Sequence, residues 1–270
     1  MKTAAKIYTA LIFLFLYAPI IVMVLFSFNA SNSTGIFTGF SFKWYVELFK
    51  NSHAFEALKN TLLLAVCSSV IATLIGTSAA VGIHSMKNRY LKRSIMSATN
   101  IPMMNPDIVT GISMMLLFVF VGLLFHYDDK LSFWTVLIAH ITFNLPYVIL
   151  SVLPKFKQMD KHLPEAALDL GCTPLQAFFK IELPEIAPGI LTGLIMAFTL
   201  SLDDFIISYF TTGSGFQTLP IFIFSMTKKR VTPDIYALST LIFICILVLL
   251  ILYNFSSSKQ KNENKNKRRD

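Results

Sequence analysis

The stretch 163–189, "LPEAALDLGCTPLQAFFKIELPEIAPG", decides how this chain must fold, because it is charged and helix-forming while its neighbours are apolar. Of the 270 residues, 54% are hydrophobic and only 14% are charged, whereas a soluble domain carries about 25% charged residues. The mean hydropathy is +0.63. Extreme apolarity over this length predicts an integral membrane protein, with the polar stretch outside the membrane.

Local signals divide the stretch into two short helices. Glu165 places a negative charge in the first turn of the first helix, and Gly171 can end that helix in a left-handed conformation. Thr173 is a favourable cap for a second helix, which we expect to run toward Ile181 and to end at Pro184. The prediction is a rigid helix, glycine turn and helix. Its apolar docking side chains would be Leu168, Leu175, Phe178 and Phe179.

Six apolar runs can each supply the roughly 20 residues that a helix needs to cross a bilayer. They are 7–28, 61–83, 95–125, 133–153, 186–210 and 235–255. None has the short alternating pattern of a membrane barrel strand. A cleaved signal peptide is the alternative for the first run, but its apolar core exceeds the usual length of about 7–15 residues. The sequence therefore predicts an all-α membrane protein with six transmembrane helices.

The distribution of Lys and Arg predicts the orientation of these helices. If the amino terminus is inside and the spans alternate, most of the 23 basic residues fall on inner segments, as the positive-inside rule requires. The cluster "KKR" at 228–230 is the exception. We therefore expect both termini and the stretch 163–189 to be cytoplasmic. The basic tail then contacts solvent and anionic lipid; nucleic-acid binding, the alternative, has no aromatic or fold support.

Other chemistries find little support in the sequence. The three cysteines have no disulfide or metal spacing, and no metal site is expected. The histidines form no nucleophile–base or metal constellation for an intramembrane enzyme; they include His84, His126, His140 and His162. Adjacent aspartates such as Asp203 and Asp204 also occur in enzymes of metal-dependent prenyl transfer. This sequence has no second acidic cluster that would complete such a metal site. The chain lacks a phosphate-binding G-x-x-x-x-G-K-[ST] loop, so a separate subunit must hydrolyse ATP if ATP is used.

The stretch 163–189 resembles the EAA motif of binding-protein-dependent ABC importer permeases: E-A-A, three residues, G, nine residues, I-x-L-P. The matching positions are Glu165, Ala166, Ala167, Gly171, Ile181, Leu183 and Pro184. We call residues 163–189 the EAA loop. The resemblance implies a type I ABC importer permease fold, in which this loop is the coupling helix seated in a cleft of an ATP-binding subunit. An ordinary amphipathic cytoplasmic loop is the alternative.

Further stretches resemble the shorter, second type of permease in spermidine/putrescine importers. They are "LYAPIIVMVLFSFN", "FSFKWYVELF", "ALKNTLLLA", "NPDIVTGISMMLLF", "HITFNLPYVI", "LSLDDFIISYFTTG" and "TLPIFIFSM". The resemblance implies a non-enzymatic permease that moves polyamines across the bacterial cytoplasmic membrane. It also implies a sister permease, a dimer of ATP-binding subunits that hold ATP and Mg, and an extracytoplasmic polyamine-binding protein. An importer of another small cationic or zwitterionic solute is the alternative.

The same resemblance divides the chain into three parts. Residues 1–56 form an amino-terminal transmembrane helix and outer loop, 57–255 form the permease core, and 256–270 form a basic cytoplasmic tail. No cofactor is expected in the chain itself. A secondary transporter would instead show inverted repeats and paired unwound helices, and would not need the EAA loop.

Three carboxylates are candidates for a solute pathway. A polycation needs carboxylates and aromatic faces along its path. Asp203 and Asp204 lie in the outer half of the fifth run, and Asp107 follows Asn105 and Pro106, where the third run should break. The alternatives remain open: Asp107 can simply cap a helix, and the pair can lie in water or contact the sister subunit.

Two shorter segments are predicted outside the spans. Ser41 can cap a short helix in the outer loop, with Trp44, Tyr45, Leu48 and Phe49 on one face. Trp and Tyr favour the membrane interface, so the segment is interpreted as an outer-leaflet anchor or as a docking surface for the solute-binding protein. Residues 219–226 are too short to span a membrane, and they predict an interfacial or re-entrant helix.

Overall fold

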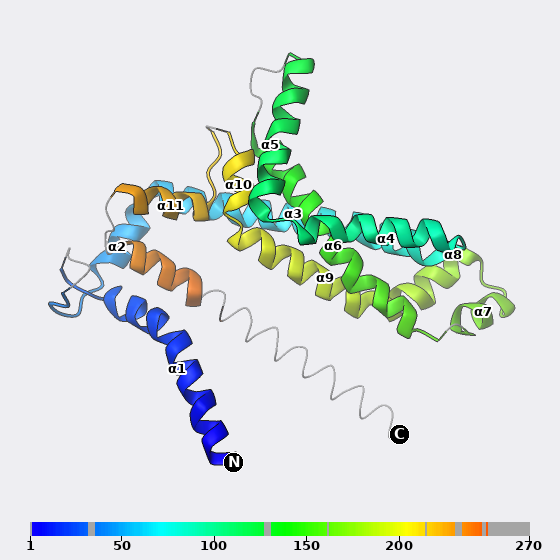
Figure 1. Ribbon diagram of the computed structural model, residues 1–270, viewed down its shortest axis with the longest axis horizontal. Coiled ribbons are helices and arrows are strands. Elements are labelled where there is room, and N and C mark those ends of the chain that lie inside the picture. Colours follow the sequence, from blue (N-terminus) through cyan, green and yellow to red (C-terminus); the bar gives the residue numbers. More distant parts are fainter. Residues whose placement is uncertain are drawn as a thin grey trace. The chain divides into compact units, whose positions relative to one another are not determined.

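The computed structural model describes residues 2–31, 36–126, 131–160, 162–213, 215–229, 234–244 and 247, and these are overwhelmingly helical (Figure 1). The elements are α1 (Lys2–Phe26), α2 (Lys43–Lys50), α3 (Ser52–Ser85), α4 (Arg89–Met104), α5 (Asp107–Leu124), α6 (Phe133–Gln158), α7 (His162–Asp169), α8 (Pro174–Ala177), a π-helical turn η1 (Phe178–Glu182), α9 (Leu183–Asp203), α10 (Ile206–Thr211) and α11 (Leu219–Lys229). A further short helix covers Asp234–Ile244.

Five helices in the described part of the chain are long and apolar enough to cross a membrane. They are Lys6–Phe26, Ser52–Ser85, Asp107–Leu124, Phe133–Gln158 and Pro174–Asp203. Each corresponds to one of the first five predicted runs. Of the sixth run, 235–255, the structure describes a helix only as far as Ile244. The sixth span and the location of both termini therefore stay predictions, and the tail 256–270 lies outside the described residues.

The chain forms two compact units, 1–55 with 223–270 and 56–222. In the second unit, α6 and α9 pack along each other with little space between their backbones (Figure 1). A Cβ added at Gly189 would stand 2.6 Å from the Lys155 Cγ, and one added at Gly193 would stand 3.2 Å from the Val148 Cα. Small residues permit such close packing of helices in membranes.

The core around this contact is apolar and tightly filled. Val148, Val152, Ile186 and Ala197 are buried there. A Cβ at Gly76 of α3 would come within 2.7 Å of the Val148 Cγ1, so α3 also approaches α6 closely. The three helices thereby form the rigid part of the unit, on which the shorter elements are positioned.

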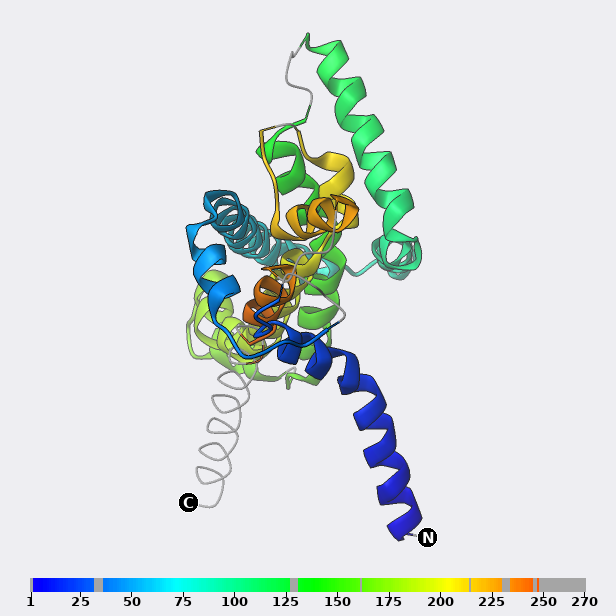
Figure 2. The ribbon, with the colours of Figure 1, turned by 90° about the vertical axis from the view of Figure 1, so that its left-hand side faces the viewer.

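Two helix breaks interrupt the second unit. The first separates α4 from α5 at Asn105 and Pro106, as the sequence predicted. The second separates α9 from α10 at Asp204 and Phe205, so the fifth run is not one continuous helix to residue 210 as expected. The two breaks are connected through packing: a Cβ at Gly111 of α5 would lie 3.0 Å from the Phe210 Cδ2 of α10. Figure 2 shows α5 and α10 from a second direction.

In the first unit, the loop after α1 is organised around Asn29. Its side-chain amide donates to the Ile36 carbonyl at 2.7 Å, and its carbonyl oxygen accepts from the Thr38 N–H at 2.9 Å. The Trp44 Nε1 donates to the backbone carbonyl of Asn29 at 2.7 Å. The indole of Trp44 is therefore buried and hydrogen-bonded within the protein. The sequence had predicted that it would lie on a helix face directed to the membrane interface.

The short helix α2 differs from its prediction in two details. Phe42 occupies the N-cap position, and Ser41 contributes only by accepting the Lys43 N–H at 3.1 Å. Trp44 and Leu48 are buried while Phe49 is 71% exposed, so the four residues expected on one face are divided between two. The segment 219–226 does form a short helix, α11, as predicted.

Candidate functional site

The EAA loop begins with a helix that ends at a left-handed glycine. Gly171 has φ +85°. Its N–H donates to the Leu168 carbonyl at 2.9 Å, and the Cys172 N–H donates to the Ala167 carbonyl at 3.0 Å. These two bonds form a Schellman motif, which satisfies carbonyls at the end of a helix. The predicted glycine turn is therefore confirmed.

The second helix of the loop begins as predicted and continues further than predicted. The Thr173 Oγ accepts the Gln176 N–H at 3.3 Å, and the Gln176 Oε1 accepts the Thr173 N–H at 3.1 Å. This capping box starts α8. The prediction that Pro184 ends this helix is wrong, because α8 continues through η1 into α9.

The π-helical turn explains why Pro184 is tolerated. Proline lacks an N–H, and its ring clashes with the carbonyl four residues earlier in an ordinary α-helix. In η1 the Leu183 N–H instead donates to the Phe178 carbonyl, five residues back, and this wider turn absorbs an extra residue just before Pro184. The EAA loop is thus joined to the span α9 by one continuous helix, Pro174–Asp203.

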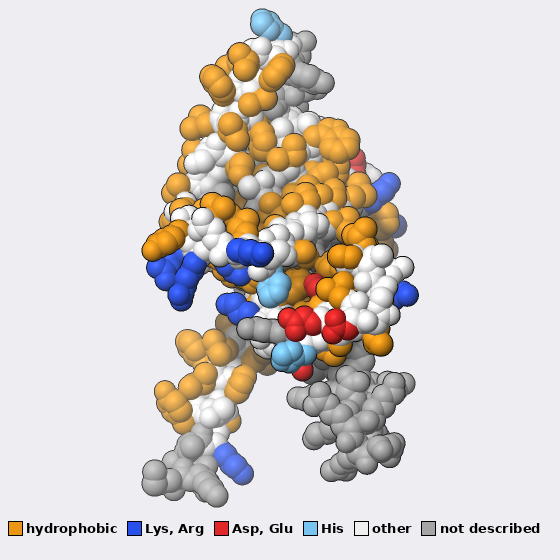
Figure 3. Space-filling model, turned by 90° about the vertical axis from the view of Figure 1, so that its right-hand side faces the viewer, with side chains coloured by type: hydrophobic (Ala, Val, Ile, Leu, Met, Phe, Trp, Pro, Cys, Tyr) orange, Lys and Arg blue, Asp and Glu red, His pale blue; other side chains and the backbone are white. Residues whose placement is uncertain are grey.

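The EAA loop exposes apolar side chains beside acidic ones. Leu168, Leu175 and Phe179 are 44%, 71% and 60% exposed. Glu165 is exposed and lies 3.3 Å from the His162 Nδ1. Of the other motif positions, Ala167 is buried, Ile181 and Leu183 are half-buried, and Ala166 and Pro184 are exposed. Figure 3 faces this end of the unit and shows acidic and apolar side chains exposed close together.

The break between α9 and α10 separates the two neighbouring aspartates. Asp203, the last residue of α9, is exposed. Asp204 is only 8% exposed, and its carboxylate accepts the Ile207 N–H at 3.2 Å and the Ser208 N–H at 2.8 Å. Asp204, one residue before the N-cap residue Phe205, therefore accepts N–H groups of α10 with a buried carboxylate, while the neighbouring Asp203 is exposed.

A buried polar cluster surrounds Asp204. The His140 Nε2 lies 3.3 Å from the Asp204 Oδ2 and 3.0 Å from the Ser208 Oγ, and the His140 Nδ1 lies 3.0 Å from the Ser201 Oγ. The Asn144 amide donates to the same Ser201 Oγ at 2.9 Å. Sequence reasoning missed this cluster, although His140 and Asn144 stand one helical turn apart in an apolar run.

Asp107 stands at the other break. It is the first residue of α5 and is exposed, and Pro106 rather than Asp107 holds the N-cap position. Tyr147 of α6 lies within electrostatic range of its carboxylate. A groove at the same break has a mostly apolar lining, with polar side chains from Asn105, Thr110, Ser113 and Thr142 among Pro102, Val109, Met114, Leu117 and Phe143. The exposed carboxylate of Asp107 stands at this break but is not part of the groove lining.

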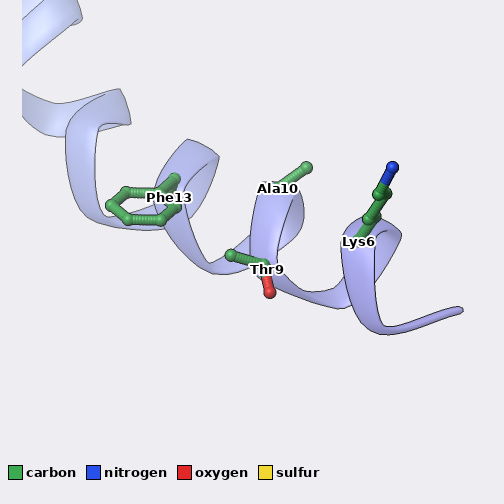
Figure 4. Close-up of a pocket in the computed structure, with 4 residues that line it drawn as sticks. All are labelled: Lys6, Thr9, Ala10 and Phe13. Carbon is green, nitrogen blue, oxygen red and sulfur yellow. The ribbon is translucent and has the colours of Figure 1, made fainter. Parts of the chain in front are cut away.

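Two further features of the described part of the chain offer no ligand site. A shallow hollow on α1 is lined by Lys6, Thr9, Ala10 and Phe13 (Figure 4). All four belong to one helix, so no second element encloses a ligand there. Among the described residues, no group of three or more His, Cys, Asp or Glu could hold a metal ion.

Together, the apolar spans and the exposed EAA loop define a permease subunit of an ABC importer. The chain belongs to the family described as "Binding-protein-dependent transport system inner membrane component", whose model matches residues 72–260. It is therefore a multi-pass protein of the bacterial inner membrane, and a transporter subunit rather than an enzyme.

Curated relatives resemble most of the chain. The "Putrescine transport system permease protein PotI" of Escherichia coli K12 is 38% identical over 230 residues, 85% of this chain and 82% of the relative. The "Spermidine/putrescine transport system permease protein PotC" of the same strain is 38% identical over 233 residues, 86% of each chain.

Solved structures agree on the fold. A bacterial ABC transporter involved in the import of the acidic polysaccharide alginate matches with a TM-score of 0.76 and 18% identity, covering 96% of this chain and 94% of that one. An amino acid ABC transporter matches with a TM-score of 0.52 and 22% identity, covering 79% and 98%. At these identities the likeness supports the importer permease fold alone.

Proposed function

We propose that this permease imports polyamines. The names of its relatives describe them as permeases of polyamine transport systems. The observation that carries the proposal is 38% identity over more than four-fifths of the chain to permeases of putrescine and of spermidine/putrescine systems. A permease for another small cationic or zwitterionic solute is the second candidate. The exposed carboxylates favour a cationic solute in either case.

The proposed path passes the two helix breaks. Asp107 and Asp203 are exposed at the ends of α5 and α9, and charged residues in membrane spans usually face a cavity or a partner. Tyr147 adds an aromatic face near Asp107, where an ammonium group can be held by cation–π contact. The Asp204 side chain lies in the same region but is buried. We therefore assign it a structural role beside the path rather than direct contact with the solute.

The proposed assembly supplies what this chain lacks. A sister permease would complete the path as a heterodimer, and an extracytoplasmic polyamine-binding protein would deliver the solute. Two ATP-binding subunits would hold ATP and Mg. The exposed Leu168, Leu175 and Phe179 of the EAA loop would dock into one of them, and the continuous helix from Pro174 to Asp203 would carry the resulting motion to the break at Asp204.

Import by the reconstituted complex tests the proposal. A unit charge 4 Å from an ammonium contributes about 4 kcal/mol at an effective dielectric of 20, before desolvation is subtracted, and each 1.4 kcal/mol is about tenfold. Asp203→Asn should therefore slow spermidine import at least about tenfold, and putrescine import less. Glu56→Gln, which removes an exposed carboxylate at the start of α3, is the matched control.

Two results would contradict these proposals separately. A wild-type complex that imports neither polyamine would refute the substrate class. A wild-type complex that imports both, while Asp203→Asn and Asp107→Asn import at the same rates, would refute the acidic path and leave the substrate class standing.

A further inference from the structure

The buried cluster at the second break has a hydrogen-bond pattern with a defined direction. A carboxylate offers acceptors only, so the contact of Asp204 with His140 requires a proton on Nε2. The Ser201 hydroxyl has three neighbours, His140, Asn144 and the Ser68 hydroxyl at 2.8 Å. Three is the capacity of one hydroxyl, which donates once and accepts twice. The cluster therefore joins α3, α6, α9 and α10 in one arrangement.

This arrangement fixes where α10 begins. The Asp204 carboxylate receives two N–H groups of α10 and one of the His140 ring. A second contact lies at the far end of α10, where the Thr135 hydroxyl of α6 stands 2.8 Å from the Thr211 carbonyl and 2.7 Å from the Ser132 carbonyl, and its one proton can be donated to either. With contacts to α6 at both ends, the short helix α10 has one position relative to the rigid part of the unit.

The position of α10 in turn determines the position of both exposed carboxylates. Asp203 precedes Asp204 directly, so its direction follows from the break. Asp107 is one turn before Gly111, where a Cβ would stand only 3.4 Å from the Ile206 carbonyl oxygen. Because α5 and α10 are in such close contact, a shift of α10 moves the first turn of α5 as well.

Stability alone gives no reason for a polar cluster here. Buried charge pairs are often replaceable by well-packed apolar residues without loss of stability, and the surrounding core is apolar. What hydrogen bonds add is a single geometry, because they are directional. We propose that His140 and Asp204 are positioning residues for transport: their contact fixes the break and so aims Asp203 and Asp107. This inference rests on the proposed acidic path.

Asp204→Asn tests the cluster, because it keeps the size of the side chain and one acceptor oxygen but replaces the other oxygen by an NH2 group, which cannot accept an N–H. In the assembled transporter, the ratio of spermidine to putrescine import per complex should shift by at least about twofold, the lower end of coupling between residues in contact. The shift should have the direction of Asp203→Asn. Adding Asp204→Asn to a variant that already carries both Asp203→Asn and Asp107→Asn should change the ratio no further. A purely structural role would lower the amount of complex and leave the ratio unchanged.

Cysteine labelling measures the positioning without any solute. Single cysteines at 203 or 107 are placed in a complex without Cys67, Cys172 and Cys245. Asp204→Asn and His140→Gln should each change the labelling rate by a charged thiol reagent by at least about twofold. Ser78→Ala, which removes an exposed hydroxyl that bonds only within α3, is the control and should leave the rates unchanged.

The possible outcomes test the positioning role of His140 and Asp204 separately from polyamine import. Equal labelling rates in wild type, Asp204→Asn and His140→Gln overturn the positioning role whatever the solute. An unshifted import ratio in Asp204→Asn, with a shifted ratio in Asp203→Asn, also overturns it. If the complex with Asp204→Asn does not assemble, the import ratio and the labelling rates are measured on His140→Gln instead, with the same expected results. A complex that imports no polyamine refutes the proposed function, and the labelling rates still decide whether the cluster positions the two sites.

Discussion

Replacing Gly171 by Val tests the EAA loop through its backbone alone. A Cβ at Gly171 would meet nothing within 4 Å, so the substitution creates no clash. It does force a β-branched residue to φ +85°. For an L-residue the left-handed region costs about 1–2 kcal/mol, and strained positions reach roughly 3 kcal/mol. Val should relieve this strain by giving up the turn.

Loss of the turn would disturb the surface that faces the ATP-binding partner. The hydrogen bonds from the Gly171 and Cys172 N–H groups would weaken, and the angle between α7 and α8 would change. If about 1–2 kcal/mol is lost from docking, the affinity for the ATP-binding subunit falls roughly 5- to 30-fold. The partner would then assemble poorly or hydrolyse ATP without import.

The assay measures assembly with the ATP-binding subunit and the solute imported per ATP hydrolysed. Gly171→Asn is the matched control, because Asn tolerates the left-handed region and has the same open space around it. It should retain most of the coupling that Val loses. Unchanged assembly and coupling in Gly171→Val would refute the coupling role, and equal losses in Asn and Val would refute the backbone explanation.

Three further predictions concern topology and packing. A reporter fused after Phe255 should be cytoplasmic and one in the loop 29–51 should be outside; an externally accessible carboxy terminus would rule out six spans with this orientation. Gly189→Val should cost about 1–3 kcal/mol by overpacking α6 against α9, and should lower the melting temperature in detergent, unlike Gly82→Val, whose Cβ would have open space; equal melting temperatures would contradict this packing. Trp44→Phe removes the hydrogen bond that holds the outer loop, and proteolysis of that loop should become faster; an unchanged rate would show that the bond is dispensable.

Features set by adjacent residues could be predicted from the sequence. The first five spans follow from apolar length, the left-handed turn at Gly171 from the lack of a Cβ, and the break after Met104 from Asn105 and Pro106. Each depends on the residues at that point in the chain. The capping box at Thr173 is of the same kind, since its two partners are three residues apart.

The error at Pro184 shows where such local reasoning fails. A proline after a short helical pattern normally marks an end, because its ring and missing N–H disrupt an α-helix. Here the π-helical turn at 178–182 accommodates it. That turn has no sequence signal of its own, and the helix that follows it, α9, packs closely against α6.

The two aspartates show the same limit within the candidate site. Asp203 and Asp204 are identical and adjacent, so the sequence assigned them one role. Their environments differ because His140, on another helix, reaches only Asp204. Substituting both together would mix the loss of a solute contact with the loss of a buried cap, and a slow transporter would not distinguish them. Single substitutions should instead be compared by the ratio of spermidine to putrescine import. That ratio, together with the labelling rates, distinguishes a carboxylate that contacts the solute, as proposed for Asp203, from one that positions another carboxylate, as proposed for Asp204.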